Sequence, residues 1–336
     1  MLRRISILTL AALSAFGFCQ TPTWDQLKAV YDVKPLSDDA VKTQDRSAPE
    51  GTYTEFNFPS DNGGTAYGTL VRPNAKGPFP LVVLLHGLGG DHKFMIDALA
   101  KDFLAKGFAV IALDAPHNGA RATADDRKAL QSTFMKFAMS KDRAEGLGPF
   151  MFHDNAAVNT KFVTEAIEGG IRDIRRAIDW AAAPGHRVDG MHIGALGVSM
   201  GSMMASILSG VDPRIDADVL VIGGDPIAPF ISQVPADQQL VAAAAAPSLF
   251  LTHSTAHVLM LNGYSDTVMT RGDTQRLFES APGAILAYFD TPGDMGHGFG
   301  HSISAEGYGF GVDWLCRMIA VPKPAERSHA KPLGGP

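Results

Sequence analysis

The chain has 336 residues, of which 46% are apolar and 19% are charged, as in a globular protein and unlike a disordered one. Its formal net charge is −6, and no segment is rich in lysine and arginine, so the sequence gives no indication of a nucleic-acid partner. The length allows one large domain or two small ones with a sizeable core.

The first residues predict a secretory signal. Two arginines precede an uncharged, mostly apolar run over residues 5–18, which is too short to remain as a membrane anchor. We therefore expect residues 1–20 to be a signal peptide, and the mature protein to be secreted or periplasmic without a membrane span. A lipoprotein anchor at Cys19 is the less favoured alternative, because the bulky Phe18 precedes it.

The chain has only two cysteines, Cys19 and Cys316. They exclude a disulfide framework, and there is no CxxC metal-binding pattern. Cys316 lies in the apolar stretch VDWLCRMIA, where we expect a core residue.

The next segments alternate between strand and helix signals. After an N-terminal arm, 21–50, two alternating segments flank the turn-rich PSDNGG and predict a β-hairpin. Buried apolar runs and amphipathic segments follow. We expect strands at 80–87, 108–114, 191–197, 217–224, 256–263 and 283–290, and helices at 92–107, 165–185, 199–208, 270–281 and 304–320. The Pro-rich tail, 321–336, is expected to be disordered.

This alternation predicts an α/β fold over residues 51–320: one mostly parallel, doubly wound sheet with helices on both faces. In the helix at 165–185, four isoleucines at spacings of four, three and four mark one buried face. Two stretches, about 118–159 and 225–253, do not fit the alternation. We interpret them as insertions over the active face.

Ser199 stands between Gly197 and Gly201 in the pattern G-x-S-x-G, at the junction of a buried strand and a helix. A tight turn at such a junction brings strand and helix close together, so the flanking positions need residues without side-chain bulk. The helix N-terminus also offers free N–H groups to a developing oxyanion. We interpret Ser199 as a nucleophile rather than as part of a structural Gly-Ser turn.

A serine nucleophile needs a base, and in a doubly wound sheet the active groups follow the C-terminal ends of strands. His297, in a glycine-rich loop after the last strand, is the predicted base, whereas the nearby His301 is interpreted as a surface or packing histidine. Asp266 follows the preceding strand and completes the chain order Ser, Asp, His as the orienting acid. The alternative is that Asp266 merely caps the next helix.

The loop HGLGG, which leaves the first buried strand, is the predicted source of an oxyanion hole. The backbone N–H of Leu88 and that of Met200, directly after the nucleophile, are the predicted donors. We expect His86 to be a structural hydrogen-bonding residue.

The segment DAPHNGAR follows another strand end. Its Asp114, His117 and Arg121 are candidate substrate contacts. A structural brace between the aspartate and the arginine is at least as compatible with the sequence.

Five motifs occur in one order between about residues 52 and 318: VVLLHGLGGD, FAVIALDAPHNGAR, RRAIDWAAAPGHRVDGMHIGALGVSMGS, VLMLNGYSDTVM and GDMGHGF. With them the chain resembles the α/β-hydrolase superfamily, most closely its dienelactone hydrolase and acetyl-esterase/prolyl-oligopeptidase-like branch. The resemblance implies the roles given above to the serine, aspartate and histidine and to the two backbone donors, with no metal or organic cofactor. Many relatives have a glycine where Ser202 stands, and the insertions vary too widely for a pocket to be transferred.

We therefore expect a secreted serine hydrolase that cleaves a small-molecule carboxylic ester through an acyl-enzyme; the oligomeric state is left open. A peptidase, an acyltransferase or a cofactor-free haloperoxidase on the same triad is the alternative. A non-catalytic binding protein on this fold is disfavoured, because all three triad positions are intact. The Phe- and Met-rich segment 134–152 is compatible with binding an apolar acyl or aromatic group, and equally with a place in the core.

Overall fold

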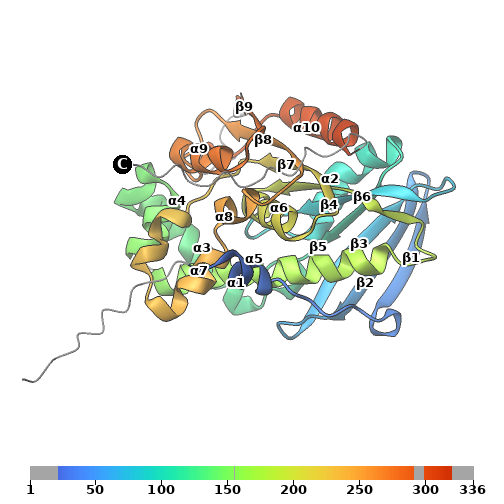
Figure 1. The fold of residues 1–336 in the computed structure, drawn as a ribbon, viewed down its shortest axis with the longest axis horizontal. Helices are drawn as coiled ribbons and strands as arrows, with labels where there is room; N and C mark the ends of the chain where they lie inside the picture. Colours follow the sequence, from blue (N-terminus) through green and yellow to red (C-terminus); the bar gives the residue numbers. More distant parts are fainter. Residues whose placement is uncertain (1–21, 155, 291–298, 320–336) are drawn as a thin grey trace, which may run out of the picture.

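The computed structural model describes residues 22–154, 156–290 and 299–319. In these residues nine strands form one sheet in the order β1-β2-β3-β5-β4-β6-β7-β8-β9 (Figure 1). The first strands and the β3–β5 pair are antiparallel, whereas β5, β4 and β6 to β9 are parallel. The strands are β1 Lys42–Ala48, β2 Gly51–Pro59, β3 Thr65–Arg72, β4 Phe79–Leu85, β5 Ala109–Leu113, β6 Val188–Val198, β7 Ile215–Val221, β8 His257–Gly263 and β9 Ile285–Phe289.

Helices cover both faces of the sheet, which confirms the predicted fold class. Helices α2 and α10 lie over one apolar core, and α5 and α6 over the other (Figure 1). The central parallel strands β4 and β5 are apolar throughout because both of their faces are covered. The helices are α1 Trp24–Ala29, α2 His92–Ala105, α3 Ala124–Met139, α4 Leu147–Pro149, α5 Ala156–Ala181, α6 Met200–Val211, α7 Gln239–Ala244, α8 Pro247–Leu251, α9 Arg271–Ser280 and α10 Ala305–Met318.

The buried face predicted for the helix at 165–185 is confirmed in α5. Its isoleucines at positions 167, 171, 174 and 178 are at most 1% exposed. Cys316 of α10 is half-buried against the core on the opposite face of the sheet, and burial raises the pKa of its thiol to about 11.

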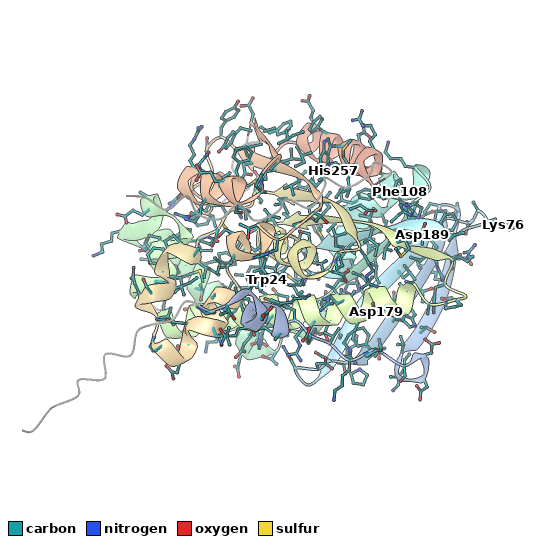
Figure 2. All side chains as sticks on the ribbon, viewed as in Figure 1. Trp24, Lys76, Phe108, Asp179, Asp189 and His257 are labelled. Carbon is teal, nitrogen blue, oxygen red and sulfur yellow. The ribbon has the colours of Figure 1, made fainter. Side chains whose placement is uncertain are left out.

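The N-terminal arm contains α1, the 3₁₀ turn Asp38–Ala40 and β1. Strand β1 pairs with β2 along its whole length, but six of its seven residues are exposed, so it carries no alternating pattern. In α1, a capping box at Thr23 begins the helix. Figure 2 marks Trp24 on α1. Its ring stacks on that of His253, with centroids 3.7 Å apart, which holds α1 against the second insertion.

Both predicted insertions are helical. The first contains α3 and α4 with the 3₁₀ turns Gly119–Arg121 and Lys141–Glu145, the π-helical Phe150–Asp154 and the first residues of α5. The second contains α7 and α8 after the 3₁₀ turns Ala228–Gln233 and Ala236–Gln238. None of the helices in the described ranges combines the length and apolarity needed to cross a bilayer. The expected signal peptide with Cys19, the expected tail and His297 lie outside the described residues.

Candidate active site

Ser199 occupies a sharp turn between β6 and α6. Its φ of 56° and ψ of −115° are angles that non-glycine residues rarely adopt. A methyl group placed on Gly197 would lie 2.0 Å from the carbonyl oxygen of Gly201, so no larger residue fits there. The glycines of the G-x-S-x-G pattern are therefore explained by the close approach of strand and helix.

Ser199 and Asp266 are brought together by one imidazole ring. The Nε2 atom of His301 lies 2.8 Å from the Oγ of Ser199, and its Nδ1 lies 2.8 Å from the Oδ2 of Asp266. The arrangement fits a ring that donates from Nδ1 to the carboxylate and accepts the serine proton at Nε2. The side chains of His301 and Asp266 are 18% and 3% exposed, so the hydrogen bonds are largely shielded from water.

The carboxylate of Asp266 is held in place by the backbone. Its Oδ1 accepts the N–H groups of Val268 and Met269 at 2.8 and 3.0 Å, which leaves Oδ2 for the imidazole. Thr270, not Asp266, caps α9 through a capping box. The alternative that Asp266 merely caps this helix is therefore not what the structure shows.

His301 occupies the place between Ser199 and Asp266 that the sequence analysis predicted for His297. His297 lies outside the described residues, and the interpretation of His301 as a surface or packing histidine is wrong. Phe299 explains the placement, because its carbonyl oxygen accepts both the N–H and the hydroxyl of Thr267 at 2.9 Å. Gly300 then turns the chain with a φ of 58°, against the backbone of Ser265. No sequence signal distinguishes two histidines in one loop, since this choice depends on contacts with another loop.

The predicted oxyanion loop lies beside the serine. A methyl group placed on Gly87 would lie 3.5 Å from the Cβ of Ser199. In the part of the chain that the structure describes, no hydrogen bond occupies the N–H of Leu88. Met200 is the first residue of α6, where an N–H has no acceptor within its own helix. Both predicted donors are thus next to Ser199 and available.

His86 fixes the direction of one donor. Its Nε2 accepts the N–H of Ala115 at 3.0 Å, so the ring proton is on Nδ1, which lies 2.8 Å from the carbonyl oxygen of Gly87. The peptide between Gly87 and Leu88 is planar and trans, so its N–H points away from its C=O. The ring is 2% exposed, and burial lowers its pKa, which favours this neutral form. The predicted structural role of His86 thus extends to orienting the Leu88 N–H.

The side chains of Asp114 and Arg121 act as structural supports. The carboxylate of Asp114 is 1% exposed and accepts from the ring of His92 and the N–H of Ala120, each at 2.8 Å. Arg121 donates to the backbone oxygen of Asp114 at 3.2 Å, and its ion pair, at 2.7 Å, is with Asp173. Arg121 thus binds Asp114 as the predicted brace requires, but through the backbone oxygen of Asp114, while its ion pair is with the carboxylate of Asp173.

His117, the third residue of that loop, has a φ of 63°. Its two ring nitrogens lie 3.1 Å from the carboxylates of Asp126 and Glu165, beside a polar cavity next to the β2–β3 turn. No group of three or more potential metal-ligating side chains occurs within the described ranges.

The parallel sheet and the serine turn agree with a family comparison. The family model of the alpha/beta hydrolase fold matches residues 80–308. The chain belongs to this family. No curated protein sequence matches it significantly.

Several solved structures of alpha/beta hydrolase fold share the architecture. The acetyl xylan esterase from Paenibacillus sp. R4 has 17% sequence identity and a TM-score of 0.61, covering 88% of this chain and 92% of its own. Acetyl xylan esterase 1 from Thermoanaerobacterium sp. JW/SL YS485 has 13% identity and a TM-score of 0.58, covering 90% and 100%. A cold-adapted esterase from an Arctic intertidal metagenomic library has 21% identity and a TM-score of 0.54, covering 82% and 97%. At these identities the likeness establishes the fold.

Proposed function

We propose that this protein is a serine hydrolase that cleaves carboxylic esters through an acyl-enzyme. Ser199 is the nucleophile, His301 the general base and Asp266 the residue that orients it. The observation that carries the proposal is the ring of His301, placed at 2.8 Å from both the serine oxygen and the buried carboxylate. Structures of the same fold that are named esterases support an ester as the substrate.

In the proposed reaction, His301 takes the proton of Ser199 as the serine oxygen attacks the ester carbonyl. The negative charge that develops on the carbonyl oxygen is held by the N–H groups of Leu88 and Met200. The tetrahedral intermediate expels the alcohol, which receives the proton from His301. Water then attacks the acyl-enzyme with the same base, and the acid leaves.

The test compares two histidines of one loop. Ser199→Ala and His301→Ala are expected to lower kcat for p-nitrophenyl butyrate by ~10⁴-fold or more, while His297→Ala retains activity. A fluorophosphonate probe should label Ser199, as read by peptide mass spectrometry. Full activity of Ser199→Ala would refute the proposal, and loss of activity in His297→Ala alone would transfer the role of base to that residue.

A peptidase or an acyltransferase would use the same three side chains. Three assays separate these activities. Release of the acid in water measures ester hydrolysis, transfer of the acyl group to an added alcohol measures acyltransferase activity, and cleavage of peptide amides measures peptidase activity. We expect hydrolysis of the ester to dominate.

We also propose that the protein is exported. The arginine-led apolar run over residues 5–18 supports this, and residues 1–20 would be absent from the mature protein. N-terminal sequencing of the protein recovered outside the cytoplasm tests it; an intact N-terminus on cytoplasmic protein alone would contradict it.

A further inference from the structure

Helix α3 contacts the two loops that flank Ser199. At one end, a methyl group placed on Gly89 would lie 2.7 Å from the Cδ2 of Leu130 and 4.0 Å from the Cε2 of Phe134. At the other end, the buried ring of Phe137 stacks on that of Phe299, with centroids 5.5 Å apart. One helix therefore reaches from the oxyanion loop to the loop that carries His301.

The three residues that make these contacts share one side of α3. Leu130, Phe134 and Phe137 follow one another at spacings of four and three, which places them on a single helical face. We call them the inner face. At a rise of about 1.5 Å per residue, this face spans roughly 10 Å between the two loops. Exposure changes along it, from the buried Phe137 to Phe134, which is 44% exposed.

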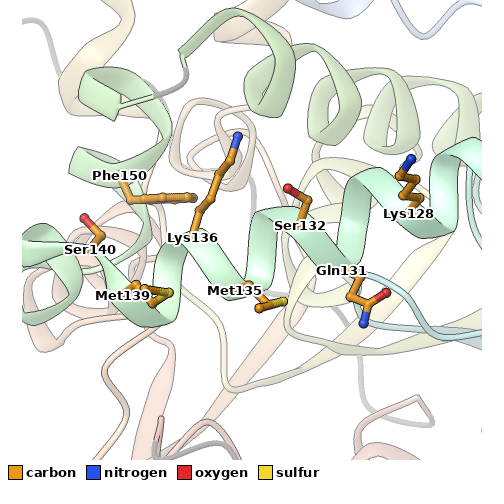
Figure 3. Close-up of a pocket in the computed structure, with 8 residues that line it drawn as sticks. All are labelled: Lys128, Gln131, Ser132, Met135, Lys136, Met139, Ser140 and Phe150. Atoms are coloured by element: carbon orange, nitrogen blue, oxygen red, sulfur yellow. The ribbon is translucent and has the colours of Figure 1, made fainter.

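Residues on the opposite side of α3 are exposed, and Figure 3 shows those that line a pocket there. Met135 is 58% and Met139 is 83% exposed. These methionines line a shallow groove together with other residues of the same side and with Phe150: Lys128, Gln131, Ser132, Lys136 and Ser140. Helix α3 is therefore a single layer, with the reactive loops on one side and water on the other.

We propose that Leu130 and Phe134 form the acyl side of the substrate site and select esters with an apolar acyl group of four or more carbons. This inference rests on the proposed function. The leaving oxygen must lie at the Nε2 of His301 to receive its proton, so the acyl group extends to the other side, along the oxyanion loop. There the half-exposed ring of Phe134 is the apolar surface that an acyl chain can cover, and covering it is favourable.

The experiment measures kcat/KM for p-nitrophenyl acetate, butyrate and hexanoate, which share one leaving group. The wild type is expected to prefer the two longer esters. Phe134→Ala should lower kcat/KM roughly 10-fold for the hexanoate ester and less than about 2-fold for the acetate ester. Phe134→Leu should retain most of the preference. Met135→Ala, on the outer side of the same helix, is the matched control and should leave kcat/KM unchanged for both esters.

Two results would overturn the inference while leaving the proposed function intact. One is a wild type that prefers acetate; the other is an equal loss for acetate and hexanoate in Phe134→Ala. An unchanged melting temperature of each variant shows that the helix is in place. If Ser199→Ala hydrolyses all three esters as well as the wild type, the proposed function itself fails, and this inference fails with it.

Discussion

A methyl group placed on Gly201 would lie 2.1 Å from the carbonyl oxygen of Leu85. The first turn of α6 thus rests directly on the backbone at the end of β4, from which the oxyanion loop departs. This contact between two backbones holds Ser199 in register with the loop that carries the proposed oxyanion donor Leu88, and neither backbone can move aside by a change of side-chain rotamer.

Gly201→Ala is therefore expected to destabilise the protein by about 3 kcal/mol or more, because the backbone must move. Gly309 of α10 provides the matched control, since a methyl group there meets nothing within 4 Å. Gly309→Ala should stabilise by about 0.5–1 kcal/mol through helix propensity. Urea unfolding of both variants checks this, and similar effects for the two would contradict it.

The backbone angles of Ser199 predict a conflict between activity and stability. A non-glycine residue at such angles costs ~1–3 kcal/mol, and glycine relieves this strain at the expense of a more flexible unfolded chain. We expect Ser199→Gly to be about 1 kcal/mol more stable than Ser199→Ala, with both variants inactive. Equal unfolding free energies for the two would mean that the turn is not strained.

The hydrogen bond from His86 to Gly87 predicts a kinetic effect. His86→Ala removes one of the two hydrogen bonds to the Gly87 carbonyl oxygen and leaves the one from the Gly90 N–H at 3.0 Å. The peptide that carries the Leu88 N–H is then held less firmly, which should lower kcat ~10- to 100-fold with KM changed less than about 3-fold. His192→Ala, whose ring is half-exposed on β6, should leave both constants unchanged. Steady-state kinetics well below the melting temperature test this; an effect on KM alone would argue against an orienting role.

Asp218 on β7 predicts a pH-dependent stability. It is 0% exposed, and no hydrogen bond within normal geometry reaches either carboxylate oxygen in the described residues. The nearby hydroxyl of Ser209, which offsets a small part of the effect of burial on the pKa of Asp218, donates to the carbonyl oxygen of Ser206 at 3.2 Å. Burial raises its pKa from 3.8 to about 8. Between these values the folded protein keeps a proton that the unfolded chain loses, so the free energy of unfolding falls as pH rises from about 4 to 8.

Asp218→Asn removes this ionisation. The variant should be more stable than the wild type by a margin that grows with pH and reaches roughly 1–3 kcal/mol near pH 8. Urea unfolding at pH 5, 6.5 and 8 measures the margin. A margin independent of pH would show that Asp218 does not titrate in this range.

Local physical constraints explain what the sequence predicted well. Strand β4 is apolar at every buried position because helices cover both faces, and Gly197 cannot be larger because Gly201 lies against it. Such constraints act between near neighbours in the chain or within one layer. They sufficed for the parallel sheet, the serine turn and the strand end that carries Asp266.

The features that the sequence did not reveal depend on distant contacts or on their absence. Which histidine reaches Asp266 is decided by hydrogen bonds between Phe299 and Thr267, 32 residues apart. Strand β1 shows no alternation, because an exposed edge strand has no face to bury. Helix α3 carries apolar residues on two opposite sides, so no single amphipathic stripe marks it.

Helix α3 belongs to the connection between β5 and α5, whereas the groups that would react follow β4, β6, β8 and β9. The residues proposed to select the acyl group and those proposed to react therefore lie in separate segments of the chain. Phe134, the half-exposed member of the inner face, can therefore be exchanged during evolution without changing the residues of the serine turn or of the loop that carries the imidazole. The same scaffold can in this way acquire new substrates by exchanging one connection.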